Sequence, residues 1–102
     1  MKLEHAEVQR LLAQLPAWER RDERGGTLFR EFTFRDFAQA FGFMSQVAVH
    51  AEKRNHHPEW CNVYNRMAVT LTTHDVNGLS MSDIDMALLM DRIAAALAAQ
   101  AQ

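Results

Sequence analysis

Five histidines are the residues of this chain best suited to acid–base chemistry, and two of them are adjacent. Because imidazole has an unperturbed pKa of about 6.5, it can donate or accept a proton at neutral pH. His56 and His57 stand side by side, and His74 follows at a distance. Glu52 and Asp75 lie close enough in the sequence to orient these rings. The pattern predicts an acid–base site built on three histidines.

A β-hairpin would bring the two histidine segments together. With a turn centred on residues 65–66, antiparallel pairing places Trp60 opposite Leu71 and His57 opposite His74. Directly opposed side chains on one face of such a pair lie about 4.5–5.5 Å apart at Cβ. We therefore expect His57 and His74 to share one site.

A metal site is the obvious alternative, because three histidines and a carboxylate could ligate zinc. Consecutive residues of an extended chain point to opposite faces, so His56 and His57 are poorly spaced for chelation. The chain has one cysteine and no His-x-x-x-His spacing. We therefore expect neither a metal nor another cofactor, and favour acid–base chemistry.

Periodicity and turn residues predict the elements that position these histidines. Pro16 ends the first helix, Gly25-Gly26 suits a tight turn, and Asp36 and Ser80 can cap helices. The expected elements are a helix over 2–15, a hairpin over 18–24 and 27–34, a helix of about 18 residues from Asp36, strands within 59–73, and a helix over 81–100. This order, α-β-β-α-β-β-α, predicts a single α+β domain over residues 1–102, with a four-stranded antiparallel sheet and three helices packed on one face.

The second helix carries the clearest apolar stripe, at spacings of four and three residues. It should face the core through Phe37, Phe41, Met44, Ala48 and Ala51. The helix should end near residues 54–55, because Pro58 biases the residue before it away from helix.

Composition excludes several classes of protein. The chain has 102 residues, 48% of them hydrophobic and 24% charged, which is typical of a globular domain. Its net charge of −2 argues against a general nucleic-acid binder. No apolar run approaches the roughly 20 residues needed to span a bilayer, and we expect the mixed, charged N-terminus not to act as a signal peptide. One cysteine suits a reducing compartment, so we expect a cytoplasmic protein without direct nucleic-acid or membrane partners.

Several segments, in this order, resemble the pterin-4a-carbinolamine dehydratase (4a-hydroxytetrahydrobiopterin dehydratase) family. They are Phe34-Arg-Asp-Phe37, Ala40-Phe-Gly-Phe-Met44, Ala51-Glu-Lys53, His56-His-Pro-Glu-Trp60, Asn62-Val-Tyr-Asn65, Leu71-Thr-Thr-His-Asp75 and Gly78-Leu-Ser80. Together they span roughly residues 18–88. The resemblance implies the α+β fold described above and assembly into homodimers or homotetramers.

The resemblance also implies a reaction and its residues. The family removes water from the 4a-carbinolamine of a tetrahydropterin to give quinonoid dihydropterin, which recycles the cofactor of aromatic amino-acid hydroxylases. The implied catalytic residues are His56, His57 and His74. The implied substrate-binding residues are Glu52, Pro58, Thr73, Asp75, Val76, Trp18 and Asp83. Asn55 departs from the pattern, because some members carry Asp there.

The proposed chemistry suits imidazole. A ring nitrogen can expel the hydroxyl group if an acid protonates the departing oxygen, and a base must then collect a ring proton. Histidines can do both without a metal or redox cofactor. An alternative function also follows from the resemblance, because some animal members act as dimerisation cofactors of a transcription factor. Retention of all three histidines favours the enzyme.

Overall fold

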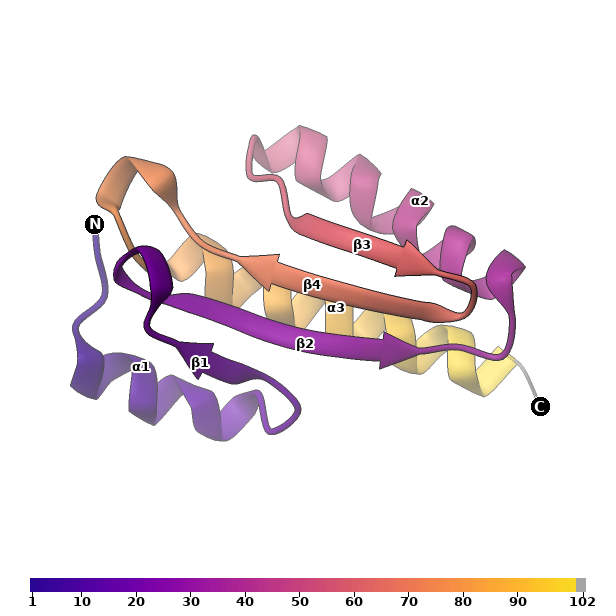
Figure 1. Ribbon diagram of the computed structural model, residues 1–102, viewed down its shortest axis with the longest axis horizontal. Coiled ribbons are helices and arrows are strands. Elements are labelled where there is room, and N and C mark those ends of the chain that lie inside the picture. Colours follow the sequence, from indigo (N-terminus) through magenta and orange to yellow (C-terminus); the bar gives the residue numbers. More distant parts are fainter. Residues whose placement is uncertain (101–102) are drawn as a thin grey trace.

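The computed structural model describes residues 1–100, and the last two residues of the expected domain, 101 and 102, lie outside the described residues. Its main elements are α1 (His5–Leu11), β1 (Glu19–Arg21), β2 (Thr27–Thr33), α2 (Phe37–Arg54), β3 (Glu59–Val63), β4 (Arg66–Leu71) and α3 (Met81–Gln100). The predicted α-β-β-α-β-β-α order is confirmed (Figure 1). Short 3-10 turns extend α1 over Leu12–Gln14, tighten the β1–β2 loop over Glu23–Gly25, and follow β4 over His74–Val76.

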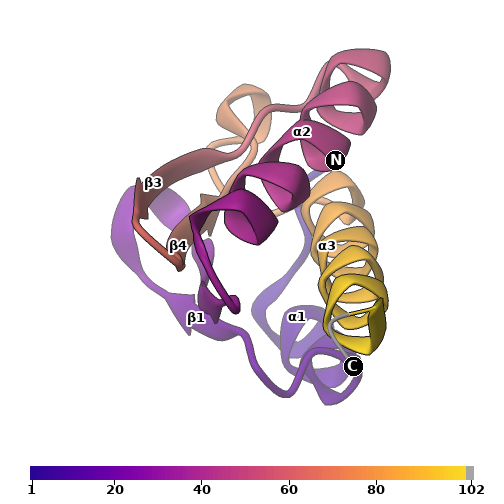
Figure 2. The same ribbon diagram turned by 90° about the vertical axis from the view of Figure 1, so that its right-hand side faces the viewer.

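The four strands form one antiparallel sheet in the order β1-β2-β4-β3. The long central pairing runs from Leu28 opposite Leu71 to Thr33 opposite Arg66. All three helices lie on the same side of this sheet (Figure 2). The fold is therefore the predicted α+β layer arrangement, with β1 and β3 as its edges.

The core lies between the sheet and the helices. Its largest fully buried side chains include Phe32, Phe43, Leu15, Leu28, Met67, Leu71, Leu79, Ile84, Met86 and Met90. Phe43 packs against both Phe32 and Phe34, with ring centroids 4.8 and 5.0 Å apart. Burying a side chain of this size contributes roughly 1.5–3 kcal/mol. The core therefore fixes α2 and α3 against the strands that lead into the histidine segments.

The predicted Asp36 cap forms, whereas the predicted Ser80 cap forms in part, because the Ser80 hydroxyl contacts Thr73 instead of the Asp83 N–H. The Asp36 carboxylate accepts a hydrogen bond from the backbone N–H of Gln39 at 2.8 Å, and that bond holds the pKa of Asp36 below its usual range. At α3, the Asp83 carboxylate accepts from the backbone N–H of Ser80 at 3.0 Å. These caps set where α2 and α3 begin.

The predicted core face of α2 is wrong in part. Phe37 and Phe41 are 50% and 55% exposed, and Ala48 is also exposed. The buried row is instead Ala40, Phe43, Val47 and Ala51. The helix carries apolar residues around most of its circumference, so two rows with helical spacing compete and the periodicity cannot separate them.

The predicted register of the β3–β4 hairpin is also wrong, by two positions. Trp60 lies opposite Val69 rather than Leu71. The turn is Tyr64-Asn65, one residue earlier than predicted, with Tyr64 at φ 52° and Val63 paired with Arg66. His57 and His74 are therefore not a cross-strand pair, and both lie outside the strands. Within residues 1–100, no helix is long and apolar enough to cross a membrane.

Candidate functional site

The two histidine segments meet where α2 ends and where β4 leads into α3. The first segment begins at Asn55, which adopts the left-handed conformation (φ 52°) that ends α2. The backbone N–H of His56 then donates to the carbonyl of Ala51 at 3.1 Å. Asparagine tolerates this conformation better than most residues. The backbone geometry therefore explains why asparagine suits position 55, where some family members carry Asp.

His56 is the buried member of the cluster. Its Nε2 lies 2.6 Å from Oδ1 of Asp83, and its side chain is only 14% exposed. Asp83 is completely buried, and its Oδ2 accepts from the Thr73 hydroxyl at 2.7 Å as well as from the Ser80 N–H. We assign the proton of this contact to Nε2 of His56, because both oxygens of Asp83 then act as acceptors. In the neutral ring, Nδ1 is then the free acceptor.

His57 has a different environment. Its Nε2 lies 2.9 Å from Oε1 of Glu52, in the last turn of α2. The side chains are 56% and 83% exposed, so solvent screens this pair. The contact orients the ring of His57 while leaving its other edge open to a ligand.

His74 belongs to a chain of exposed polar side chains. Its Nε2 lies 3.5 Å from Oε2 of Glu59 at the start of β3. Glu59 also accepts two hydrogen bonds from the Arg24 guanidinium, at 2.7 and 2.8 Å. The Arg24 hydrogen bonds hold the pKa of Glu59 below its usual range, with a smaller contribution from His74, although partial burial opposes the shift. Glu59 therefore links the β1–β2 loop to His74.

Backbone contacts close the loop that carries His74. Thr73 forms a bridge with Gly78 around the 3-10 turn His74–Val76, with an N–H to carbonyl distance of 2.9 Å. The neighbouring β1–β2 loop approaches so closely that a Cβ on Gly25 would lie 2.0 Å from the carbonyl oxygen of Asn77. Gly25 also has a φ of 81°, so this contact requires glycine.

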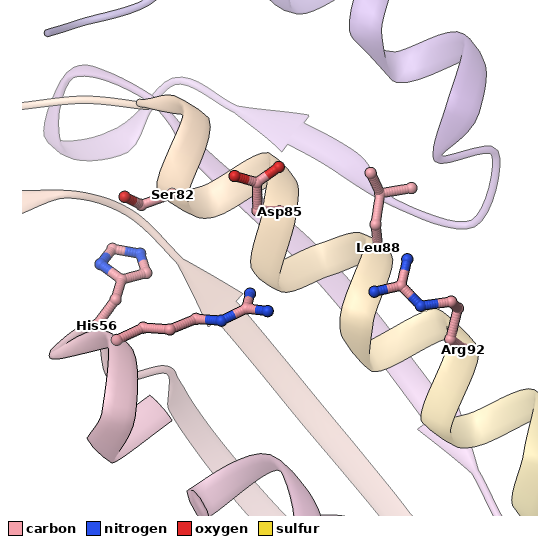
Figure 3. Close-up of a pocket in the computed structure, with 6 residues that line it drawn as sticks. His56, Ser82, Asp85, Leu88 and Arg92 are labelled. Carbon is pink, nitrogen blue, oxygen red and sulfur yellow. The ribbon is translucent and has the colours of Figure 1, made fainter. Parts of the chain in front are cut away.

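Two hollows border this cluster. The first, of about 350 Å³, lies between the end of α2 and the first turns of α3, and His56 contributes to its wall (Figure 3). The second, of about 520 Å³, lies beside the N-terminal segment and includes Thr73, Asp75 and Val76 in its wall. Neither hollow is lined by His57 or His74, which lie on the exposed surface.

The structure brings most of the expected site residues together and separates one of them. His56, Thr73 and Asp83 share one network, and Pro58 joins His57 to β3. Trp18 lies instead in the core, 6% exposed, with its Nε1 donating to Asp91 at 2.8 Å and its ring against Phe32. Its contacts are those of a packing residue.

The sequence did not predict that three arginines lie near the site, nor that Asp83 is buried beneath His56. Arg24 binds Glu59, and Arg54 and Arg92 line the hollow beside His56. Asp83 was expected to line the site, but the structure buries it under His56. The capping signal Ser80–Asp83 was visible, yet nothing in the spacing links position 83 to position 56. No three His, Cys, Asp or Glu side chains within residues 1–100 are grouped so that they could hold a metal.

Comparison with known proteins assigns the chain to a family. The family model for pterin 4 alpha carbinolamine dehydratase matches residues 1–93. A Novosphingobium aromaticivorans protein bearing this family's name is 58% identical over 90 residues, which cover 88% of this chain and 93% of that protein. A Burkholderia multivorans protein of the same name is 49% identical over 94 residues, which cover 92% of this chain and 91% of that protein.

Solved structures agree with this assignment. A crystal structure from Brucella melitensis, described as a transcriptional coactivator/pterin dehydratase, matches with a TM-score of 0.88 and 48% identity over 92% of this chain and 99% of that one. A pterin dehydratase-like protein described as a RuBisCO assembly factor shares the fold, with a TM-score of 0.66 and 22% identity over 76% of this chain and 89% of that one. The chain therefore belongs to the pterin-4a-carbinolamine dehydratase family of hydro-lyases.

Proposed function

We propose that the protein dehydrates the 4a-carbinolamine of a tetrahydropterin to quinonoid dihydropterin, and so recycles the cofactor of an aromatic amino-acid hydroxylase. The observation that carries this proposal is that His56, His57 and His74 each lie beside a carboxylate, on two segments that the Thr73–Asp83–His56 and His74–Glu59 contacts join. Family membership supplies the substrate class, and the three rings supply proton donors and acceptors without a cofactor.

The proposed reaction divides the proton transfers between the exposed rings. Protonated His57 donates to the 4a-hydroxyl, the C4a–O bond breaks, and water leaves as a ring nitrogen forms a double bond to C4a. His74 collects the proton that the pterin ring then loses. His57 and His74 suit these roles because they are the exposed rings. His56, with Nε2 held by Asp83, presents Nδ1 to the substrate as a hydrogen-bond acceptor.

Single variants test these roles on freshly generated carbinolamine. Each of His57→Ala and His74→Ala should slow dehydration by about 10²-fold or more, because a positioned proton donor or acceptor contributes about 10²–10⁴-fold. His50→Ala is the matched control, since His50 lies within α2 and outside the two histidine segments. Undiminished dehydration by His74→Ala would remove His74 from the mechanism.

We further propose that the protein forms a homodimer or homotetramer. The exposed side chains of Phe37, Phe41 and Val49 on α2 support this proposal, as do Val63 and Tyr64 at the end of the edge strand β3. An open strand edge and an exposed apolar helix face are both common sites of self-association. Sedimentation of Phe41→Glu should give a smaller species than the wild type.

The same exposed face of α2 favours one alternative, a helical partner protein, as in the coactivator function of some animal relatives. Copurification of such a partner without any turnover of carbinolamine would favour this alternative over the enzyme. Loss of self-association in Phe41→Glu with no partner recovered would favour the oligomer.

A further inference from the structure

The hollow of about 350 Å³ beside His56 has an unusual wall. Its lining residues are Arg54, His56, Ser82, Asp85, Leu88 and Arg92. Those from α3 recur at spacings of three, three and four residues, which places them on one face of the helix. Figure 3 shows this face turned toward His56 at the end of α2, with the Arg92 side chain running back along α3. Two helices therefore direct charged side chains into one hollow.

Most of the nine arginines of the chain pair with a carboxylate, and the two in this hollow do not; Arg66 on β4 also forms no ion pair within the described residues. The arginines at positions 10, 20, 21, 24, 30 and 35 each pair with a carboxylate. Arg54 and Arg92 form no ion pair with any carboxylate that the structure describes, although Asp85 lines the same hollow. One carboxylate against two guanidinium groups leaves the hollow with a positive charge.

Guanidinium groups bind oxyanions through charge-assisted, often paired hydrogen bonds. The Ser82 hydroxyl can add another donor on the same side of the hollow. An anion placed there would also relieve the repulsion between the two arginines. The ligand chemistry that this wall fits best is therefore a phosphate or carboxylate group.

We propose that this hollow binds an anionic group on the side chain of the pterin substrate, with Arg54 and Arg92 as its ligands. The proposal rests on the proposed function, because His56 borders both the hollow and the histidine cluster. A group tethered to a pterin at that cluster can reach the arginines. The substrate class is then a tetrahydropterin with a phosphorylated or carboxylated side chain, rather than one with a neutral side chain.

The test compares 4a-carbinolamines that share one ring and carry a neutral, a carboxylate or a phosphate side chain. In the wild type, we expect kcat/KM to favour the anionic substrates by about tenfold, the ratio that one charged hydrogen bond can supply. Arg54→Gln and Arg92→Gln should each reduce this ratio, whereas Lys53→Gln, which removes the same charge one residue outside the hollow, should leave it unchanged. A ratio of one in the wild type, or an unchanged ratio in both arginine variants, would overturn the proposal.

A binding measurement separates this proposal from the dehydratase activity. Inorganic phosphate should shift the backbone amide NMR signals of residues 54–56 and 82–92 saturably, and Arg92→Gln should weaken that binding about tenfold. Phosphate binding without turnover of any carbinolamine would keep the anion site and reject the dehydratase. Phosphate binding with no preference among substrates would assign the site to a free anion, against the proposal. The absence of a saturable shift would reject the anion site itself.

Discussion

His56 and His74 lie on neighbouring segments, but their carboxylate partners hold them in different ways. His56 contacts a fully buried Asp83 whose other oxygen is held by Thr73 and Ser80. His74 is 74% exposed and meets Glu59, which is itself held by an arginine from another loop. A buried, hydrogen-bonded carboxylate is costly to remove, whereas an exposed pair contributes little to stability. The buried pair therefore stabilises the fold as well as positioning His56, whereas the exposed pair mainly positions His74.

The largest expected effect comes from removing the buried carboxylate. Asp83→Ala leaves His56, Thr73 and the Ser80 N–H without their acceptor, so the free energy of unfolding should fall by about 3 kcal/mol. Turnover should also fall, by about 10²-fold, because the orientation of His56 is lost. Urea unfolding and carbinolamine decay measure the two effects. Asp85→Ala, on the exposed side of α3, is the control for unfolding and should change stability by less than about 0.5 kcal/mol.

Thr73→Val removes one hydroxyl group, and the two hydrogen-bond contacts it makes, from the same buried network. The hydroxyl of Thr73 contacts both Asp83 and Ser80 at 2.7 Å. The free energy of unfolding should fall by about 1–2 kcal/mol, since each hydrogen bond usually contributes about 1 kcal/mol. Thr70→Val, a half-buried position on β4, is the matched control. If Thr73→Val and Thr70→Val were equally stable, the buried network around Asp83 would not contribute the stability that distinguishes it from the exposed Glu59–His74 pair.

The order of the elements could be predicted from the sequence because the signals are local. Pro16, the Asp36 cap and the Ser80–Asp83 cap each act within a few residues of where they stand. The face of α2 could not be predicted, because Phe37 and Phe41 compete with Phe43 and Val47 for the core. Burial depends on what the sheet presents to the helix, and a period of 3.6 residues does not contain that information.

The site illustrates the same limit. The histidines could be identified by residue type and by resemblance, but the pairing of His57 with His74 failed when the turn formed at Tyr64-Asn65. A hairpin register depends on the turn, and Asn65-Arg66 is a weak turn signal. The partners of the histidines come from distant segments, as Asp83 and Glu59 do, and only the tertiary fold brings them into contact.

The exposed pair can be tested through pH and salt. The pKa of Glu59 is lowered in the folded protein, so its stabilising contribution is complete above the ordinary Glu range and is lost as the pH falls through the folded pKa. Glu59→Gln should lower the free energy of unfolding at neutral pH by about 0.5 kcal/mol or less after solvent screening. High salt should remove that difference, whereas it should leave the Asp83→Ala effect nearly intact. If the stability loss of Glu59→Gln persisted at high salt, the Glu59–His74 pair would not differ from the buried Asp83–His56 pair in the way proposed.

The Arg24 hydrogen bonds should account for most of the Glu59 shift. In Arg24→Gln, the pKa of Glu59 should rise toward its ordinary range, because the largest cause of the lowering is removed. NMR titration of the Glu59 carboxyl carbon measures this directly. Arg21→Gln is the control, since Arg21 pairs with Glu19 on β1 instead. An unchanged Glu59 titration in Arg24→Gln would leave His74 without a link to the β1–β2 loop.

The smallest effect should come from Asp36, whose carboxylate accepts from a backbone N–H at the start of α2, as that of Asp83 does at the start of α3, but holds no histidine. Asparagine caps nearly as well as aspartate, so Asp36→Asn should have almost wild-type stability at neutral pH. Because the folded pKa of Asp36 is lowered, the contribution of the charged cap is lost as the pH falls through that pKa, and Asp36→Asn should not show this loss. Asp83→Asn should instead be clearly destabilised at neutral pH, since its amide cannot accept from His56, Thr73 and Ser80 as the carboxylate does. Similar urea midpoints for the two variants would show that Asp83 acts only as a helix cap.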